Sequence, residues 1–162
     1  MATSPQNGLQ PAFVRVAQSE RHDDALAVVA MLAHTDLQQI RQQAEVFGLP
    51  QRGPFYPYID GDMIAKLLTS RGLVGTVWKE CKSFSELPDV AIAMCDYDEA
   101  YEVGRCVLFH RLSGEGAKAI QYVLDPYNHS DAKLHFRTDL AELVPSWYIG
   151  VHQAPSAKPK GK

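Results

Sequence analysis

The first half of the chain has the apolar spacing of three helices. Residues 25–33 are apolar on every side and follow two acidic residues that can accept hydrogen bonds at a helix start, which predicts a helix buried in the core. Thr35 and Gln38 form a capping box before a second, amphipathic helix that stops at Gly48. A third amphipathic helix is expected from about residue 60 to residue 72.

The second half changes to short runs of strand-forming residues, separated by clusters of Pro, Gly, Asp and Ser. Helices that precede strands along the chain predict an α+β fold, with the N-terminal helices packed on a mainly antiparallel C-terminal sheet. The expected strands cover residues 73–78, 90–94, 105–112, 120–124 and 147–152.

The composition predicts a single folded unit. The 162 residues are 46% apolar and 22% charged, which is ordinary for one globular domain. Residues 1–11 and 154–162 are polar and rich in Pro, so we expect a disordered N-terminus and a disordered basic tail around a domain at 12–153.

Charge and cysteine usage narrow the classes of function. A net charge of −3 gives no basic surface for nucleic acid. The three cysteines are too widely spaced for a metal-binding pair, so no metal or other cofactor is expected, and their odd number fits a reducing cytoplasm. The longest apolar run has nine residues, so neither membrane insertion nor a cleavable signal peptide is expected, and export by another route stays open. The oligomeric state stays unknown.

Three segments then carry a family resemblance. Gln18 is followed six residues later by Asp24 at the start of the buried helix; residues 104–108 read Gly-Arg-Cys-Val-Leu; and residues 123–126 read Val-Leu-Asp-Pro. In this order they resemble the papain-like peptidase domains of bacteriocin ABC exporters, which remove double-glycine leader peptides. The similarity extends over about residues 14–151 and implies a papain-like cysteine peptidase fold.

The resemblance also implies a role for each matching position. In that family the Gln helps to form the oxyanion hole, the residue at position 24 is the nucleophilic Cys, the residue at position 105 is the catalytic His, and the Asp at position 125 orients that His. Here Asp24 and Arg105 replace the catalytic pair, while Gln18 and Asp125 are kept. A papain-type mechanism needs a thiolate and an imidazole. The chain therefore resembles a peptidase-like pseudoenzyme that binds a peptide or protein segment in the old cleft, as a secretion-related adaptor or chaperone.

Several hypotheses about this site stay open. Arg105 has enough donors to bridge Asp24 and Asp125, or Asp24 only caps its helix and Arg105 is solvated. Asp24 and Asp125 could instead serve a carboxylate-dependent hydrolase, or the chain is an active cysteine peptidase if the site is aligned wrongly. Strand alternation, however, places Cys106 on the face opposite Arg105.

Other side chains are candidates for binding. Five aromatic residues could line a peptide groove or simply pack over the core: Phe55, Tyr56, Tyr58, Trp78 and Trp147. The acidic connection at 96–102 could bind a partner or merely be solvated. A metal site that includes His22, Asp23 and Asp24 is a weaker alternative.

Overall fold

The computed structural model describes residues 12–52, 59–112, 120–129 and 131–155. The ends expected to be disordered, 1–11 and 154–162, lie outside these ranges, apart from residues 154 and 155. Phe55, Tyr56 and Tyr58 also lie outside the described residues. The aromatic groove can therefore be followed only at Trp78 and Trp147.

The three expected helices are present, and each buries the side that its sequence makes apolar. They are α1 (Asp24–Leu32), α2 (Leu37–Val46) and α3 (Gly61–Ser70). Every residue of α1 after the first is buried, which confirms the prediction of a core helix. The amphipathic helices α2 and α3 bury one side only.

The helix starts differ in part from the sequence prediction. The capping box at Thr35 and Gln38 is wrong, because α2 begins one residue later and Asp36 caps it by accepting the Gln39 N–H at 2.8 Å. The Thr35 N–H is bound to the Ala30 carbonyl, so Thr35 belongs to the turn that ends α1. At α3 the cap is Asp60, as expected, which accepts the N–H of residue 63 at 2.9 Å.

One antiparallel sheet follows the helices. Its strand order is β1-β7-β3-β4-β5-β6, and β2 also pairs with β7. All five predicted strands are present, whereas β2, β6 and two short 3-10 helices were missed because two or three residues carry no periodic pattern. The elements are β1 (Leu73–Gly75), β2 (Lys79–Glu80), η2 (Phe84–Glu86), β3 (Val90–Asp98), β4 (Val103–Leu112), β5 (Ile120–Leu124), η3 (Ala132–Leu134), β6 (Phe136–Arg137) and β7 (Pro145–Gln153).

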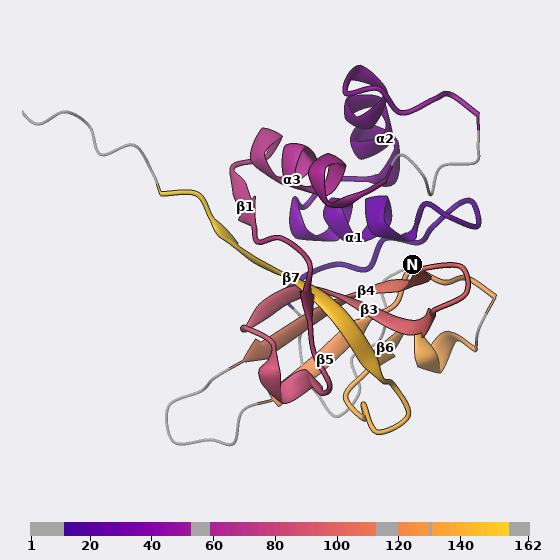
Figure 1. The fold of residues 1–162 in the computed structure, drawn as a ribbon, viewed down its shortest axis with the longest axis vertical. Helices are drawn as coiled ribbons and strands as arrows, with labels where there is room; N and C mark the ends of the chain where they lie inside the picture. The colour runs from indigo at the N-terminus through magenta and orange to yellow at the C-terminus, as the bar shows by residue number, and fades with distance from the viewer. Residues whose placement is uncertain (1–11, 53–58, 113–119, 130, 156–162) are drawn as a thin grey trace, which may run out of the picture.

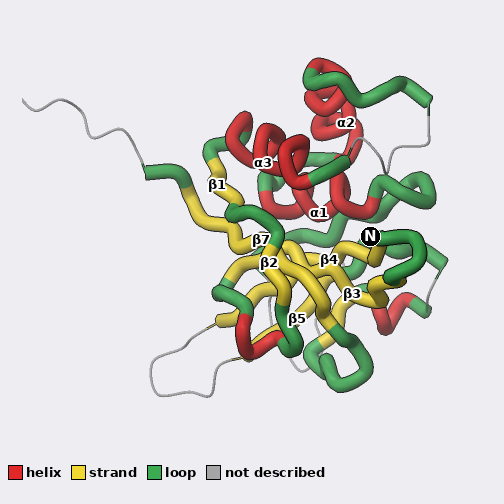
Figure 2. The backbone as a smooth tube through the Cα atoms, in the orientation of Figure 1, coloured by secondary structure: helices red, strands yellow, loops and turns green. Residues whose placement is uncertain are grey.

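The helices lie together on one face of the sheet, which gives a helical layer over a sheet layer (Figures 1 and 2). Successive residues of β4 serve the two faces: Cys106 and Leu108 join the core under the helices, and Val107 and Phe109 join a second cluster on the far face. This arrangement confirms the expected α+β architecture. The start of α1 is thereby held against the start of β4, where the resemblance places its site.

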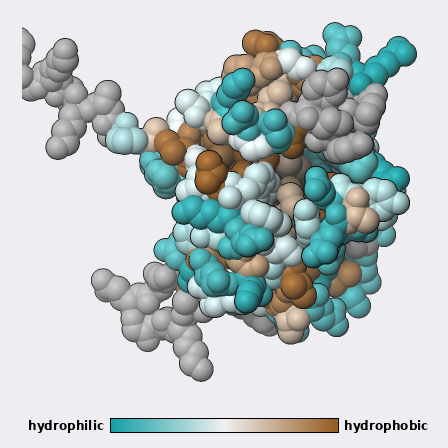
Figure 3. Space-filling model, in the orientation of Figure 1, coloured by the Kyte–Doolittle hydropathy of each residue, from teal (hydrophilic) through white to brown (hydrophobic). Residues whose placement is uncertain are grey.

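The surface drawn in Figure 3 shows hydrophobic residues as separate patches among hydrophilic ones. Among the described residues no helix has both the length and the apolar character needed to cross a membrane.

Candidate functional site

The loop before α1 is fixed by a buried carboxylate. Asp23 is fully buried and accepts hydrogen bonds from the Ser19 hydroxyl at 2.7 Å, the Ser19 N–H at 3.1 Å and the Glu20 N–H at 3.1 Å. Its side chain therefore does not cap α1, contrary to expectation; it binds the loop that precedes the helix. These hydrogen bonds fix the conformation of the loop that joins Gln18 to Asp24.

Gln18 is anchored on both sides. Its N–H donates to the Pro126 carbonyl at 2.9 Å, and its own carbonyl accepts from the Asn128 side chain at 2.9 Å. The side-chain amide nitrogen donates to the Glu20 carbonyl at 3.0 Å and the Arg21 carbonyl at 3.4 Å, while Oε1 is buried without a hydrogen-bond partner. The amide protons therefore bind carbonyls within the loop. The family resemblance, in contrast, would direct them at the carbonyl of a substrate.

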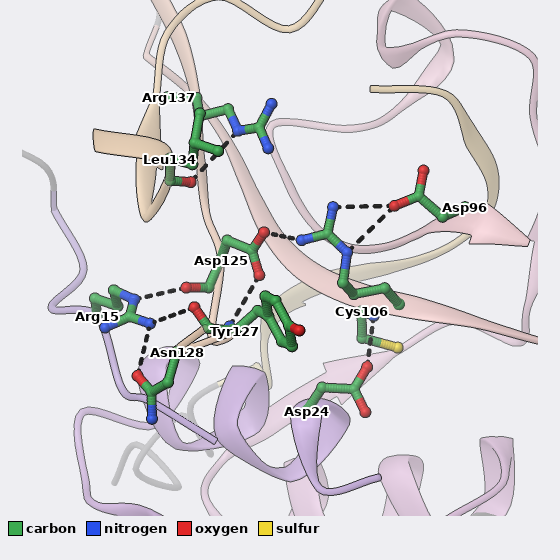
Figure 4. Close-up of polar contacts among 10 residues, drawn as sticks. Arg15, Asp24, Asp96, Cys106, Asp125, Tyr127, Asn128, Leu134 and Arg137 are labelled. Carbon is green, nitrogen blue, oxygen red and sulfur yellow. Dashed lines mark hydrogen bonds and ion pairs between the residues drawn. The ribbon is translucent and has the colours of Figure 1, made fainter. Parts of the chain in front are cut away.

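Asp24 is the first residue of α1, and its carboxylate reaches across to β4. Its Oδ2 accepts the Cys106 N–H at 2.7 Å (Figure 4). This N–H is available because β4 continues beyond its last pair with β5, which joins Leu108 and Leu124. Burial raises the pKa of Asp24, although the N–H groups of Cys106 and of the helix start partly oppose the increase.

Arg105 pairs with two carboxylates, and Asp24 is not one of them. Its guanidinium contacts the buried Asp125 and, at 3.1 and 3.3 Å, the exposed Asp96. The proposed bridge from Arg105 to Asp24 is therefore wrong. The reason is that the guanidinium is taken up by Asp125 and Asp96, while the Asp24 carboxylate binds the backbone N–H of the next residue, Cys106. Figure 4 shows Asp96 and Asp125 directed toward one guanidinium and Asp24 directed toward Cys106.

Arg15 fastens the N-terminal segment to the loop after β5. Its guanidinium donates to the carbonyls of Asp125 at 2.6 Å and Tyr127 at 3.0 Å, and to the Asn128 side chain at 3.2 Å. Sequence reasoning missed Arg15 because no motif marks it. Asp96 was noticed only as part of an acidic connection, since nothing in the sequence indicates that it folds back onto Arg105.

A cavity of about 400 Å³ opens beside Asp24, between the starts of α1 and α3 and the sheet. Trp78 and Trp147, which lie 69 residues apart in the sequence, both line it. We call this cavity the aromatic pocket. Its other large side chains, which sequence reasoning did not single out, are Ile59, Ile64, Met94 and Tyr97.

A second, more polar hollow of about 810 Å³ lies on the other side of Asp24. Gln18, Asp96 and Arg105 line it together with Asp24, so the structure brings three of the four resemblance-derived positions to one surface. The fourth, Asp125, is buried behind it and accepts the Tyr127 N–H at 3.0 Å in addition to its contact with Arg105.

The three cysteines are poor nucleophiles as they stand. All are buried. Burial raises the pKa of Cys81, raises that of Cys95 to about 12, and raises that of Cys106 well above its usual range, where the Asp24 charge adds to the effect. Cys106 lines the aromatic pocket, but as a neutral thiol.

In the part of the chain that the structure describes, the acidic and histidine side chains do not gather into a metal site. Within the described residues no three His, Cys, Asp or Glu side chains lie close enough to hold an ion together. Asp23, one member of the weaker alternative, is turned into its own loop.

Comparisons with known proteins place the fold. Neither the models of known protein families nor the curated proteins include a match to the chain. Among solved structures it is similar to a double glycine motif protease from an AMS/PCAT transporter, determined in complex with the leader peptide. The TM-score is 0.58 at 12% sequence identity, over 88% of this chain and 92% of that chain. The chain thus has the α+β fold of a papain-like peptidase domain.

Proposed function

We propose that this chain is a non-catalytic, peptidase-like domain that binds a peptide or protein segment in the cleft beside α1. The observation that carries the proposal is Asp24: at the helix start where the family resemblance expects a nucleophilic thiol, its carboxylate binds the Cys106 N–H at 2.7 Å and borders the aromatic pocket. A cleft that is lined by large apolar side chains and has a carboxylate at the position of the nucleophile is suited to binding a ligand.

The arrangement of the other polar groups supports the absence of peptidase chemistry. A papain-type reaction needs a thiolate to attack the carbonyl and an imidazole to transfer protons. Position 105 carries an arginine paired with Asp125 and Asp96, and a guanidinium has hydrogen-bond donors but no acceptor for a proton. The thiols are buried and neutral, so the route through an alternative cysteine lacks an activated nucleophile.

The pocket supports the binding role. Its volume of about 400 Å³ and its aromatic walls are typical of a site that takes up part of a ligand. The similar solved structure is described in complex with a leader peptide. A peptide is therefore the ligand class that we propose, with a secretion-related adaptor or chaperone in the cytoplasm as the setting.

Tryptophan fluorescence tests the proposal directly, because the chain contains two tryptophans and both line the pocket. We would titrate the protein with pools of capped hexapeptides and follow the emission, and then measure the mass of every peptide after prolonged incubation. The proposal expects a saturable change in emission for some pools and no cleaved product.

The Trp147→Phe variant assigns the signal to one wall of the pocket. Cleavage that Asp24→Asn leaves intact would contradict the non-catalytic role. A complete lack of binding in every pool would contradict the binding role.

A second candidate is a hydrolase that uses Asp24 as a general base, and the raised pKa of this carboxyl favours it. Asp125 is not placed to assist, because it is occupied by Arg105 and the Tyr127 N–H. Turnover of a peptide or ester that disappears in Asp24→Asn would establish this candidate in place of the first.

A further inference from the structure

The charged side chains that line the aromatic pocket are mainly carboxylates. Among the described residues that line it are three carboxylates, Asp24, Asp60 and Glu102, and neither a lysine nor an arginine. His22 is the remaining ionisable side chain apart from Tyr97 and Cys106. An apolar pocket that is negative at its edge favours a ligand with an apolar stem and a positive end.

The aromatic rings come from three separate places in the chain and are held in position. Tyr97 of β3 meets Trp147 of β7 edge to face, with ring centroids 6.4 Å apart and an interplanar angle of 60°. Trp78 lies against the start of α3 so closely that a Cβ added at Gly61 would come within 3.3 Å of its ring. Rings fixed in this way present π faces and edges to whatever enters the pocket.

The helix starts reduce the negative charge of the pocket without cancelling it. α1 and α3 both begin there, and a helix N-terminus carries roughly half a positive charge. Two such ends offset about one of the three carboxylate charges. Asp60 and Asp24 each accept a backbone N–H already, from residue 63 and from Cys106, so Glu102 is the carboxylate best able to meet a ligand directly, and Asp24 adds its charge.

Glu102 lies in the connection between β3 and β4. Its side chain is exposed, and its backbone has a φ of +52°, a left-handed conformation that a non-glycine residue seldom adopts. The end of β3 carries Asp96, which is already paired with Arg105, and the exposed Asp98, and the exposed Glu99 begins the connection. The acidic segment noted in the sequence thus contributes Glu102 to the lining of the aromatic pocket, whereas Asp96 and Asp98 line the polar hollow.

We propose that the aromatic pocket receives a lysine or arginine side chain of the bound peptide. The methylene stem lies against Trp78 and Trp147, and the cationic end is attracted by the ring faces and by the carboxylates of Asp24 and Glu102. This inference rests on the proposed peptide-binding function and adds to it the chemical class of residue that the pocket selects.

The test uses capped hexapeptides in which one position at a time is fixed and the others are mixed. Tryptophan emission measures binding to the full-length protein. The strongest arginine peptide is then resynthesised with citrulline, which keeps the shape of the side chain and removes its charge. The strongest lysine peptide is resynthesised with norleucine. We expect the neutral analogues to bind at least about tenfold more weakly, and the difference to shrink at high salt.

Variants locate the effect. Glu102→Gln should weaken binding of the arginine peptide about threefold or more and leave the citrulline peptide unchanged. Glu99→Gln is the matched control, because it removes the same charge from the same connection at a residue that does not line the pocket. An equal effect of both variants would mean that only the general field of the acidic segment acts, and would overturn the assignment to the pocket.

The outcomes separate the two proposals. If peptides bind but the fixed position prefers apolar or acidic residues, or if citrulline and norleucine bind as well as arginine and lysine, the cationic preference is overturned and the peptide-binding function stands. If no pool changes the emission, the peptide-binding function fails and this inference fails with it.

Discussion

Asp24 lines the candidate site, and the burial of its carboxylate lowers the stability of the folded protein. Its carboxylate is bound by the Cys106 N–H, yet burial still raises its pKa above the ordinary value of 3.8. A carboxyl whose pKa is higher in the folded than in the unfolded protein binds its proton more tightly when folded. Stability is therefore lost as the pH rises from about 3.8 through the folded pKa.

The first prediction follows from that sign. Asp24→Asn removes the charge, and its amide oxygen can still accept the Cys106 N–H. We expect the variant to be more stable than the wild type at neutral pH, by on the order of 1 kcal/mol. The gain should vanish near pH 3.5. Urea unfolding at a series of pH values measures it.

Asp23→Asn provides the control. The Asp23 carboxylate accepts three hydrogen bonds from Ser19 and Glu20, so the same chemical change should destabilise the protein by about 1–3 kcal/mol. A loss of stability in both variants would show that Asp24 does not carry a burial penalty.

The second prediction concerns the pair of Arg105 and Asp125. Asp125 is 1% exposed at its side chain, so removing the guanidinium leaves a buried charge without its partner. Arg105→Met should cost about 3–5 kcal/mol of unfolding free energy, and adding Asp125→Asn should recover part of that loss.

Asp96 makes the comparison possible within the same cluster. Its side chain is 59% exposed, and an exposed ion pair contributes little, so Asp96→Asn should cost less than about 1 kcal/mol. Thermal unfolding of the wild type, Arg105→Met, the double variant Arg105→Met with Asp125→Asn, and Asp96→Asn measures these differences in stability. Equal costs for Arg105→Met and Asp96→Asn would argue against a buried charge that depends on Arg105.

The sequence indicated that Asp24, Arg105 and Asp125 belong to one site, but it did not show which groups each of them binds. Asp125 and Arg105 were expected together, and they touch. The contact from Asp24 to the Cys106 N–H was not foreseeable, because a backbone donor carries no mark in a sequence and becomes free only where β5 stops pairing with β4. Asp96 returns to Arg105 through a register shift in β3, which composition does not encode.

Among the elements, the helix starts are where the sequence is most informative and where a third prediction arises. Asp36 and Asp60 make the same capping bond, at 2.8 and 2.9 Å, for α2 and α3. Asp36→Ala and Asp60→Ala should each cost about 1 kcal/mol. Of these two helix starts, that of α3 borders the aromatic pocket and that of α2 does not, so Asp60→Ala but not Asp36→Ala should shift the tryptophan emission of the folded protein. A shift of similar size in Asp36→Ala would mean that the emission does not report on the pocket alone.

All five predicted strands exist, but most of their ends differ from the prediction; β1, for example, ends at Gly75 and not at residue 78. β5 was predicted with its observed bounds, Ile120–Leu124. β3 was expected to stop at residue 94, but it continues to Asp98 across a bulge at which Asp96 has a φ of +54°. The acidic residues there have the composition of a solvated connection, and the pairing of Asp98 with Val103 on β4 overrides that tendency.

At the scale of the whole molecule, the proposed function depends on how the helical layer is positioned against the sheet. The helical layer supplies Asp24 and the sheet supplies residue 105, and the two belong to one cleft only if the layers pack as in a papain-like peptidase domain. The similarity in fold at 12% identity supports this packing. If the register is kept at the site as well, positions 24 and 105 have the geometry of a nucleophile and its base.

The fourth prediction tests that geometry. In the double variant Asp24→Cys with Arg105→His, the new thiol lies at the N-terminus of α1, which favours a thiolate. The imidazole can take up the contact with Asp125. We expect a thiol-directed alkylating reagent to modify residue 24 at neutral pH faster than it modifies free cysteine.

The three natural cysteines should not contribute to the alkylation signal, because all are buried and should stay unmodified in the folded protein. Asp24→Cys alone separates the contribution of the helix start from that of the imidazole: the double variant should react faster, with a rate that falls as the imidazole loses its proton. If both variants react at the same rate, residue 105 does not face residue 24 across the cleft. The aromatic pocket would then remain as a binding site, but the cleft would not be laid out as in a working peptidase.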